Sequence, residues 1–124
     1  MKIAIPSEAP GGLSAMRSGH FGHAACFTVV EYDGNMNIVS ADAVPNVDHD
    51  TYGCGGVIEH VLGMGVDGIL TAGMGRPPLM RFTDAGVIVY SDRTAPVVGE
   101  AAKLFAEGRV QRMSPEAACN HHDH

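Results

Sequence analysis

Residues 67–90 read DGILTAGMGRPPLMRFTDAGVIVY and place two short apolar segments on either side of a proline-containing segment. The segments 67–71 and 86–90 are compact, apolar and rich in β-branched residues, which predicts two buried strands. Residues 79–85 between them predict a helix, because proline suits the first helical turn and Gly86 suits the position after the last. A strand, a helix and a second strand in this order imply parallel strands joined by a right-handed crossover.

The rest of the chain extends this α/β pattern. Residues 2–6 predict a strand, and residues 26–32 and 36–44 flank Asp33-Gly34-Asn35, which is hairpin turn chemistry. Apolar residues at helical spacing after residue 56, and again after Thr94 as an N-cap, predict two more helices. We therefore expect a mixed five-stranded sheet with one antiparallel hairpin strand and helices on its faces. Residues 1–108 form one predicted domain, and residues 109–124 form a Cys/His-rich tail.

Composition excludes several classes of function. The 124 residues carry a net charge of −6, which argues against a nucleic-acid partner because phosphate binding needs clustered Lys and Arg. Three cysteines cannot form a closed disulfide framework, and reduced thiols are typical of cytoplasmic proteins. The N-terminus has no apolar segment typical of a signal peptide, and no apolar run approaches the ~20 residues of a membrane helix. We expect a cytoplasmic protein without a membrane or nucleic-acid partner.

Three loops are expected at one edge of the sheet. They cover residues 7–22, 45–56 and 72–78, and ligands of open α/β sheets bind beyond the carboxyl ends of the strands. The first loop ends in GHFGHAAC, where His20 and His23 are candidate metal ligands. Cys26 begins the following strand, and for this residue we favour a buried structural thiol.

The second loop contains HDTYGCGG, with Cys54 between glycines immediately before a predicted helix. A helix N-terminus lowers the pKa of a thiol and favours bound anions. His49 lies five residues upstream and can fold back toward Cys54. These residues predict a second set of metal ligands.

The third loop, TAGMGRPPLM, lacks the Gly-Lys-Ser/Thr of a P-loop and the spacing of a dinucleotide fingerprint. It predicts a general anion site with Arg76 beside it.

The tail CNHHDH, residues 119–124, is interrupted by Asp123 and preceded by Cys119, unlike an affinity tag. Short Cys/His-rich tracts are typical of metal binding. Cys119 and His122 lie three positions apart, as do His121 and His124, so either pair could bind one ion. A four-coordinate site would need further ligands from the domain, with Cys54 or His49 as candidates.

The segments HFGHAACFTVVEYDG, GCGG and GVDGILTAGMGRPPLMRFTDAGVIVY together resemble the dinitrogenase iron-molybdenum cofactor biosynthesis family. This family includes nitrogenase accessory-factor-like and orange-protein-like members. The resemblance covers roughly residues 1–108 and implies a three-layer α/β/α domain of the ribonuclease-H-like kind, without nuclease activity. It also implies binding or delivery of a metal–sulfur cluster of the Fe/Mo or Mo/Cu type. The positions that match the family pattern are His20, Cys54 and the glycine-loop residues Gly53, Gly55, Gly56, Gly73, Gly75 and Arg76.

We therefore predict a non-enzymatic carrier or scaffold for a metal or metal–sulfur cluster, with cluster donor and acceptor proteins as partners and a homodimer left open. The predicted metal ligands are His20, His23, His49, Cys54, Cys119, His121 and His122. One alternative is a transition-metal (Zn or Ni) binding or sensing protein that uses the tail. A second alternative is a small thiol enzyme that uses Cys54.

Overall fold

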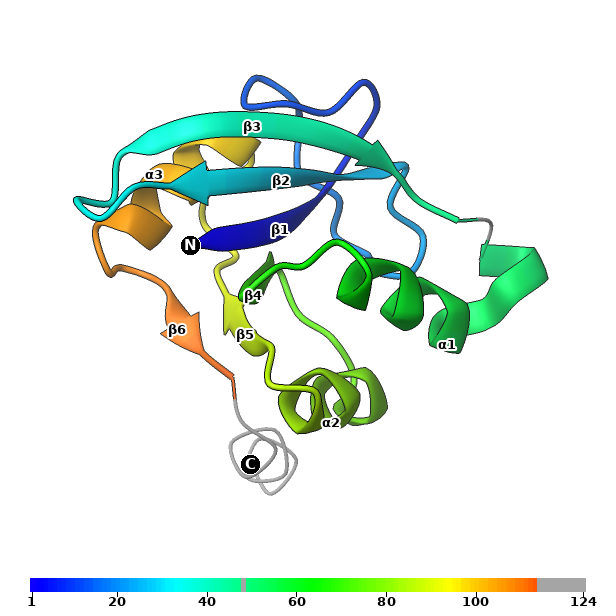
Figure 1. Cartoon of the computed structure of the whole chain (residues 1–124). Coiled ribbons are helices and arrows are strands. Elements are labelled where there is room, and N and C mark those ends of the chain that lie inside the picture. The colour runs from blue at the N-terminus through cyan, green and yellow to red at the C-terminus, as the bar shows by residue number, and fades with distance from the viewer. Residues whose placement is uncertain (48, 114–124) are drawn as a thin grey trace.

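The computed structural model describes the backbone of residues 1–47 and 49–113 and the side chains of residues 1–47 and 55–113. Within this part, the strands are β1 (Lys2–Ser7), β2 (Cys26–Tyr32), β3 (Ile38–Pro45), β4 (Gly68–Thr71), β5 (Ile88–Ser91) and β6 (Gln111–Arg112). The helices are α1 (His49–Leu62), α2 (Arg76–Asp84) and α3 (Val98–Ala106). The strands form one mixed sheet in the order β3-β2-β1-β4-β5-β6 (Figure 1).

The molecule has three layers, with α1 and α2 on one face of the sheet and α3 on the other (Figure 1). Alternation along the strands produces this arrangement, because successive side chains of a strand point to opposite faces. In β1, Ala4 belongs to the core beneath α1 and α2, whereas Ile3 and Ile5 belong to the core beneath α3. The predicted α/β/α architecture is therefore confirmed.

Strand directions define one edge of the sheet as the carboxyl edge. β1 pairs in parallel with β4, and β4 with β5, so Ser7, Thr71 and Ser91 end their strands on the same side. β3 is antiparallel to β2, which is antiparallel to β1, so β3 also ends there at Pro45. The sheet has six strands where five were predicted. The additional strand, β6, has only two residues, too few to give a recognisable sequence pattern.

The first helix begins earlier than its sequence predicts. Residues 45–56 were expected to form a loop, but α1 already starts at His49 and includes the glycines 53, 55 and 56. Helix propagation gains one hydrogen bond per added residue, and each glycine costs only about 1 kcal/mol relative to alanine. No proline lies between Pro45 and Pro77 to stop it. The expectation that Cys54 immediately precedes a helix is therefore wrong.

Thr94 is not the N-cap of α3, as the sequence suggested. Its hydroxyl donates to Asp92 Oδ1 at 2.7 Å, in the turn that follows β5. α3 begins four residues later, and the N–H groups of Val98 and Gly99 donate to the carbonyls of Ala15 and Leu13 at 2.9 and 2.7 Å. Main-chain carbonyls of the segment between β1 and β2 thus accept from the first N–H groups of α3, which a capping side chain usually satisfies.

The segment between β1 and β2, residues 8–25, passes over the carboxyl edge from one face to the other. Ala15 lies in the core beneath α3, and Phe21 lies in the core beneath α1 and α2. The first half of this segment is therefore tied to α3, and the second half to the opposite layer.

No helix in the described part of the chain is both long enough and apolar enough to cross a lipid bilayer.

Candidate functional site

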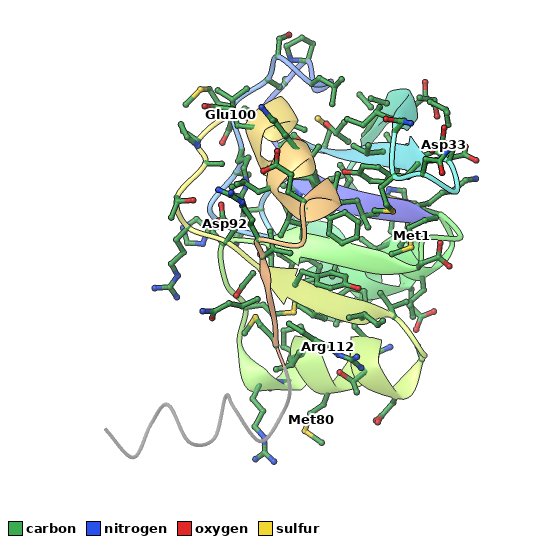
Figure 2. All side chains as sticks on the ribbon, turned by 90° about the vertical axis from the view of Figure 1, so that its left-hand side faces the viewer. Met1, Asp33, Met80, Asp92, Glu100 and Arg112 are labelled. Atoms are coloured by element: carbon green, nitrogen blue, oxygen red, sulfur yellow. The ribbon has the colours of Figure 1, made fainter. Side chains whose placement is uncertain are left out.

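Four connections meet at the carboxyl edge: residues 8–25 after β1, the link from β3 to α1, residues 72–75 after β4, and residues 92–97 after β5. In Figure 2, Asp92 marks this edge, and Met1 and Asp33 lie on the opposite side of the molecule. The loops predicted to carry the chemistry are therefore gathered at one edge.

Phe21 anchors the HFGH segment. Its side chain is only 6% exposed, and its ring packs against Phe82 of α2 at 5.5 Å and Phe27 of β2 at 6.3 Å between centroids. His20 and His23 on either side of it are both exposed. One buried aromatic ring thus fixes a short loop and leaves two imidazoles at the surface.

The two imidazoles lie close to each other. Their ring centroids are 6.5 Å apart, and the rings are nearly perpendicular, at 88°. Two imidazoles that share one ion, at about 2.1 Å per metal–nitrogen bond, have centroids roughly 5–6 Å apart. The observed separation of 6.5 Å is slightly larger than this range.

These imidazoles do not form a complete metal site within the described side chains. Among residues 1–47 and 55–113, no group of three or more His, Cys, Asp or Glu is placed to hold a metal ion. His49 is the first residue of α1 and Cys54 is its sixth, but their side chains lie outside the described set. Cys119, His121 and His122 also lie outside the described residues.

Cys26 is a structural thiol, which confirms its interpretation from sequence. It is 6% exposed, and its sulfur lies 3.6 and 3.8 Å from the carbonyls of Glu8 and Ser7. Burial, assisted by the charge of Glu8, raises the pKa of this thiol, so it stays protonated. Any Cβ on Gly11 would lie 2.9 Å from the sulfur, which shows how closely the loop covers it.

The glycine loop after β4 is a well-defined turn. Thr71 Oγ1 accepts from the N–H of Gly73 at 3.2 Å and donates to its carbonyl at 3.0 Å. Gly75 is the N-cap of α2, with no side chain capping it. Because Pro77 and Pro78 follow Arg76, the first turn of α2 lacks two of the N–H groups that usually bind an anion. The backbone is therefore a poorer anion cradle than the sequence suggested.

Arg93 is a candidate site residue that no sequence pattern indicated. Its Nε–H donates to the carbonyl of Ala72 at 2.8 Å, which places its guanidinium on the glycine loop. A Cβ on Gly73 would lie 3.2 Å from Nη2 of Arg93, so the absence of a side chain at residue 73 makes room for it. No sequence motif links a residue after β5 to a loop after β4; only the sheet order does.

The part of the edge next to α3 contains a buried ion pair. Arg17 Nη1 lies 3.2 Å from Asp92 Oδ2 and donates to the carbonyl of Ala95 at 2.8 Å. The two side chains are 6% and 8% exposed. Burial opposes the charge of Asp92, but hydrogen bonds from Ala95 and Thr94, together with the charge of Arg17, outweigh it and lower the pKa of Asp92.

His60 is satisfied within the fold, as expected for a histidine inside a helix. Its Nε2 lies 2.7 Å from the carbonyl of Pro45, at the end of β3. This contact joins α1 to the end of β3.

Ligands of open α/β sheets bind beyond the carboxyl ends of the strands, which is the edge where these exposed imidazoles and guanidinium groups lie. The sequence model of the family described as dinitrogenase iron-molybdenum cofactor matches residues 1–108. The chain belongs to this family. No curated protein matches the chain.

Solved structures share this fold. The apo form of the orange protein from Desulfovibrio gigas is 28% identical, with a TM-score of 0.77, over 91% of this chain and 92% of that one. The protein PH0822 is 25% identical, also with a TM-score of 0.77, over 91% of this chain and 96% of that one. MJ0327 from Methanocaldococcus jannaschii has a TM-score of 0.71 at 19% identity, over 92% of this chain and 95% of that one, and supports the fold alone.

Proposed function

We propose that this protein binds a metal or metal–sulfur cluster at the carboxyl edge of its sheet and carries or scaffolds it for cofactor biosynthesis. The observation that carries the proposal is the pair of exposed imidazoles, His20 and His23, with ring centroids 6.5 Å apart on a loop anchored by Phe21. Membership of an iron-molybdenum cofactor family supports a metal cluster as the cargo.

The charge at this edge favours an anionic cargo. The protein carries a net charge of −6, yet Arg76 and Arg93 flank the glycine loop and take part in none of the three ion pairs of the described residues. Metal–sulfur clusters with several sulfide ligands are commonly anionic, and guanidinium groups bind such ligands through charge-assisted hydrogen bonds. The cargo we propose is therefore a negatively charged cluster rather than a bare cation.

Further ligands must come from residues whose side chains lie outside the described set. We propose Cys54 and His49 from α1, and Cys119, His121 and His122 from the tail. The described chain leaves the sheet after Met113, whose N–H donates to Val89 at 2.8 Å. β6 runs antiparallel to β5, so the chain points away from the carboxyl edge there. The 11 residues that follow could span at most roughly 36 Å.

A binding role without catalysis remains our proposal, with cluster donor and acceptor proteins as the partners. The thiol-enzyme alternative required Cys54 at a helix N-terminus, where the dipole would activate it. Cys54 is the sixth residue of α1, and the influence of the dipole falls off within the first turn. This placement supports the binding proposal over that alternative.

The metal-sensor alternative keeps one supporting observation, which is the concentration of Cys and His in the tail. Truncation after residue 118 separates the two proposals. Protein isolated without oxygen should keep a coloured, sulfide-containing cluster after truncation if the edge is the main site. Loss of all metal on truncation would favour a zinc or nickel site in the tail. In the full chain, Cys54→Ser should lower metal retention, and unchanged retention would exclude Cys54 as a ligand.

A further inference from the structure

The basic residues of the described chain divide into two groups. Arg17, Arg81 and Arg109 lie within 4 Å of a carboxylate, at 3.2, 2.7 and 3.5 Å. The other five, which include Arg76 and Arg93, take part in no ion pair of the described residues. Of these five, only Arg76 and Arg93 adjoin the glycine loop at the carboxyl edge.

The position of Arg93 is fixed from two sides. Its Nε–H is bound to the carbonyl of Ala72, and Nη2 lies above Gly73, 3.2 Å from where a Cβ would be. With Nε occupied, the two terminal nitrogens remain as donors. Arg93 itself is exposed, so a ligand can reach them from solvent.

Arg76 lies three residues after Gly73, a path of at most roughly 11 Å along the chain. It is the first residue of α2 and is also exposed. Pro77 and Pro78 remove the next two backbone donors. An anion at this loop must therefore be held mainly by side chains, and a guanidinium fork matches the oxygens of a tetrahedral oxyanion.

We propose that Arg93, seated on Gly73 and assisted by Arg76, forms a binding site for a tetrahedral oxyanion of the molybdate type. This inference rests on the proposed function, since it assigns an inorganic oxyanion to the same edge as the cluster. The site uses neither of the two imidazoles. Oxyanion binding therefore needs neither iron nor sulfide, and it can be measured on metal-free protein.

The test is titration calorimetry of the metal-free full-length chain with molybdate at low ionic strength, with phosphate as a second anion of the same shape. We expect saturable binding that weakens as salt is added. Arg93→Gln should weaken it by about tenfold or more, since a charge-assisted hydrogen bond is lost. Arg112→Gln removes another exposed charge, on β6 and outside the glycine loop, and should leave the affinity unchanged.

A second variant tests whether the contact of the Arg93 guanidinium with Gly73 is needed for binding, without removing the charge of Arg93. Gly73→Ala places a methyl group against the end of the Arg93 side chain, the single group within 4 Å of that position, and should weaken binding at unchanged net charge. Gly34→Ala is the matched control, because nothing lies within 4 Å of it. Thermal unfolding of both variants separates altered binding from altered folding.

Weaker oxyanion binding by Arg93→Gln and Gly73→Ala, with both control variants unchanged, supports the site. If phosphate and molybdate bind with equal affinity, the site accepts tetrahedral dianions in general. Absence of binding to the wild type, or binding that Arg93→Gln leaves intact, would overturn it. Cluster retention that depends on His20 and His23 would then still stand, so the two proposals can fail separately.

Discussion

The two halves of the carboxyl edge use polar groups in opposite ways. Next to α3, Arg17 and Asp92 are buried together, and the carbonyls of Leu13 and Ala15 satisfy the first donors of α3. Next to α1 and α2, His20, His23 and Arg93 are exposed on loops that buried groups hold in place. The same segment, residues 8–25, contributes to both halves. One half of this loop is therefore buried against the fold, and the other half places His20 and His23 at the surface.

Removal of the buried ion pair should have the largest effect on stability. Arg17→Met leaves Asp92 buried without its partner, and we expect the free energy of unfolding to fall by about 3–5 kcal/mol. Arg81→Met breaks an exposed pair with Glu59, between α2 and α1, and should cost about 0–1 kcal/mol. Urea denaturation measures both variants. Equal losses would contradict the assignment of a structural role to the α3 half.

The anchor of the imidazole loop should show a smaller loss of stability but a clear loss of binding. Phe21→Leu should cost about 1–2 kcal/mol and let His20 and His23 move apart, which lowers the metal content of the isolated protein. Phe105→Leu, in the core beneath α3, is the matched control, since the two rings are 6% and 7% exposed. It should lose similar stability and keep its metal. A parallel loss of metal in both variants would show that binding depends only on overall stability.

We expect low pH to destabilise the α3 half of the carboxyl edge before the other half. Because the pKa of Asp92 is lowered in the folded state, its contribution to stability is present above the unfolded pKa of about 3.9. That contribution is lost as the pH falls through the lower, folded-state pKa. Asp92→Asn should therefore flatten the dependence of unfolding free energy on pH below about 4. If the unfolding free energy of Asp92→Asn depended on pH as the wild type does, the stabilising role assigned to the Asp92 carboxylate would be refuted.

Much of the fold could be read from local patterns, and much of the site could not. Residues 26–32 were predicted as a strand and are β2, because β-branched and aromatic residues there are bounded by clear turn signals. Helix α1 was placed too late, since glycine opposes a helix only weakly once a buried face propagates it. The Arg17–Asp92 pair joins residues 75 positions apart, and Arg93 reaches Ala72 across 21. Such contacts depend on the order of strands in the sheet, which no local spacing encodes.

The exposed half should matter least for stability and most for the cargo. The double variant His20→Ala/His23→Ala changes two exposed side chains, and we expect the free energy of unfolding to change by less than about 1 kcal/mol. The most direct measurement is elemental analysis with a visible spectrum, on wild type and double variant isolated without oxygen. We predict a sulfide-containing metal cluster in the wild type, and loss of its metal and colour in a folded double variant. Equal metal content in both proteins, or no metal uptake by the wild type when iron, molybdate and sulfide are supplied, would contradict a cluster site at this edge.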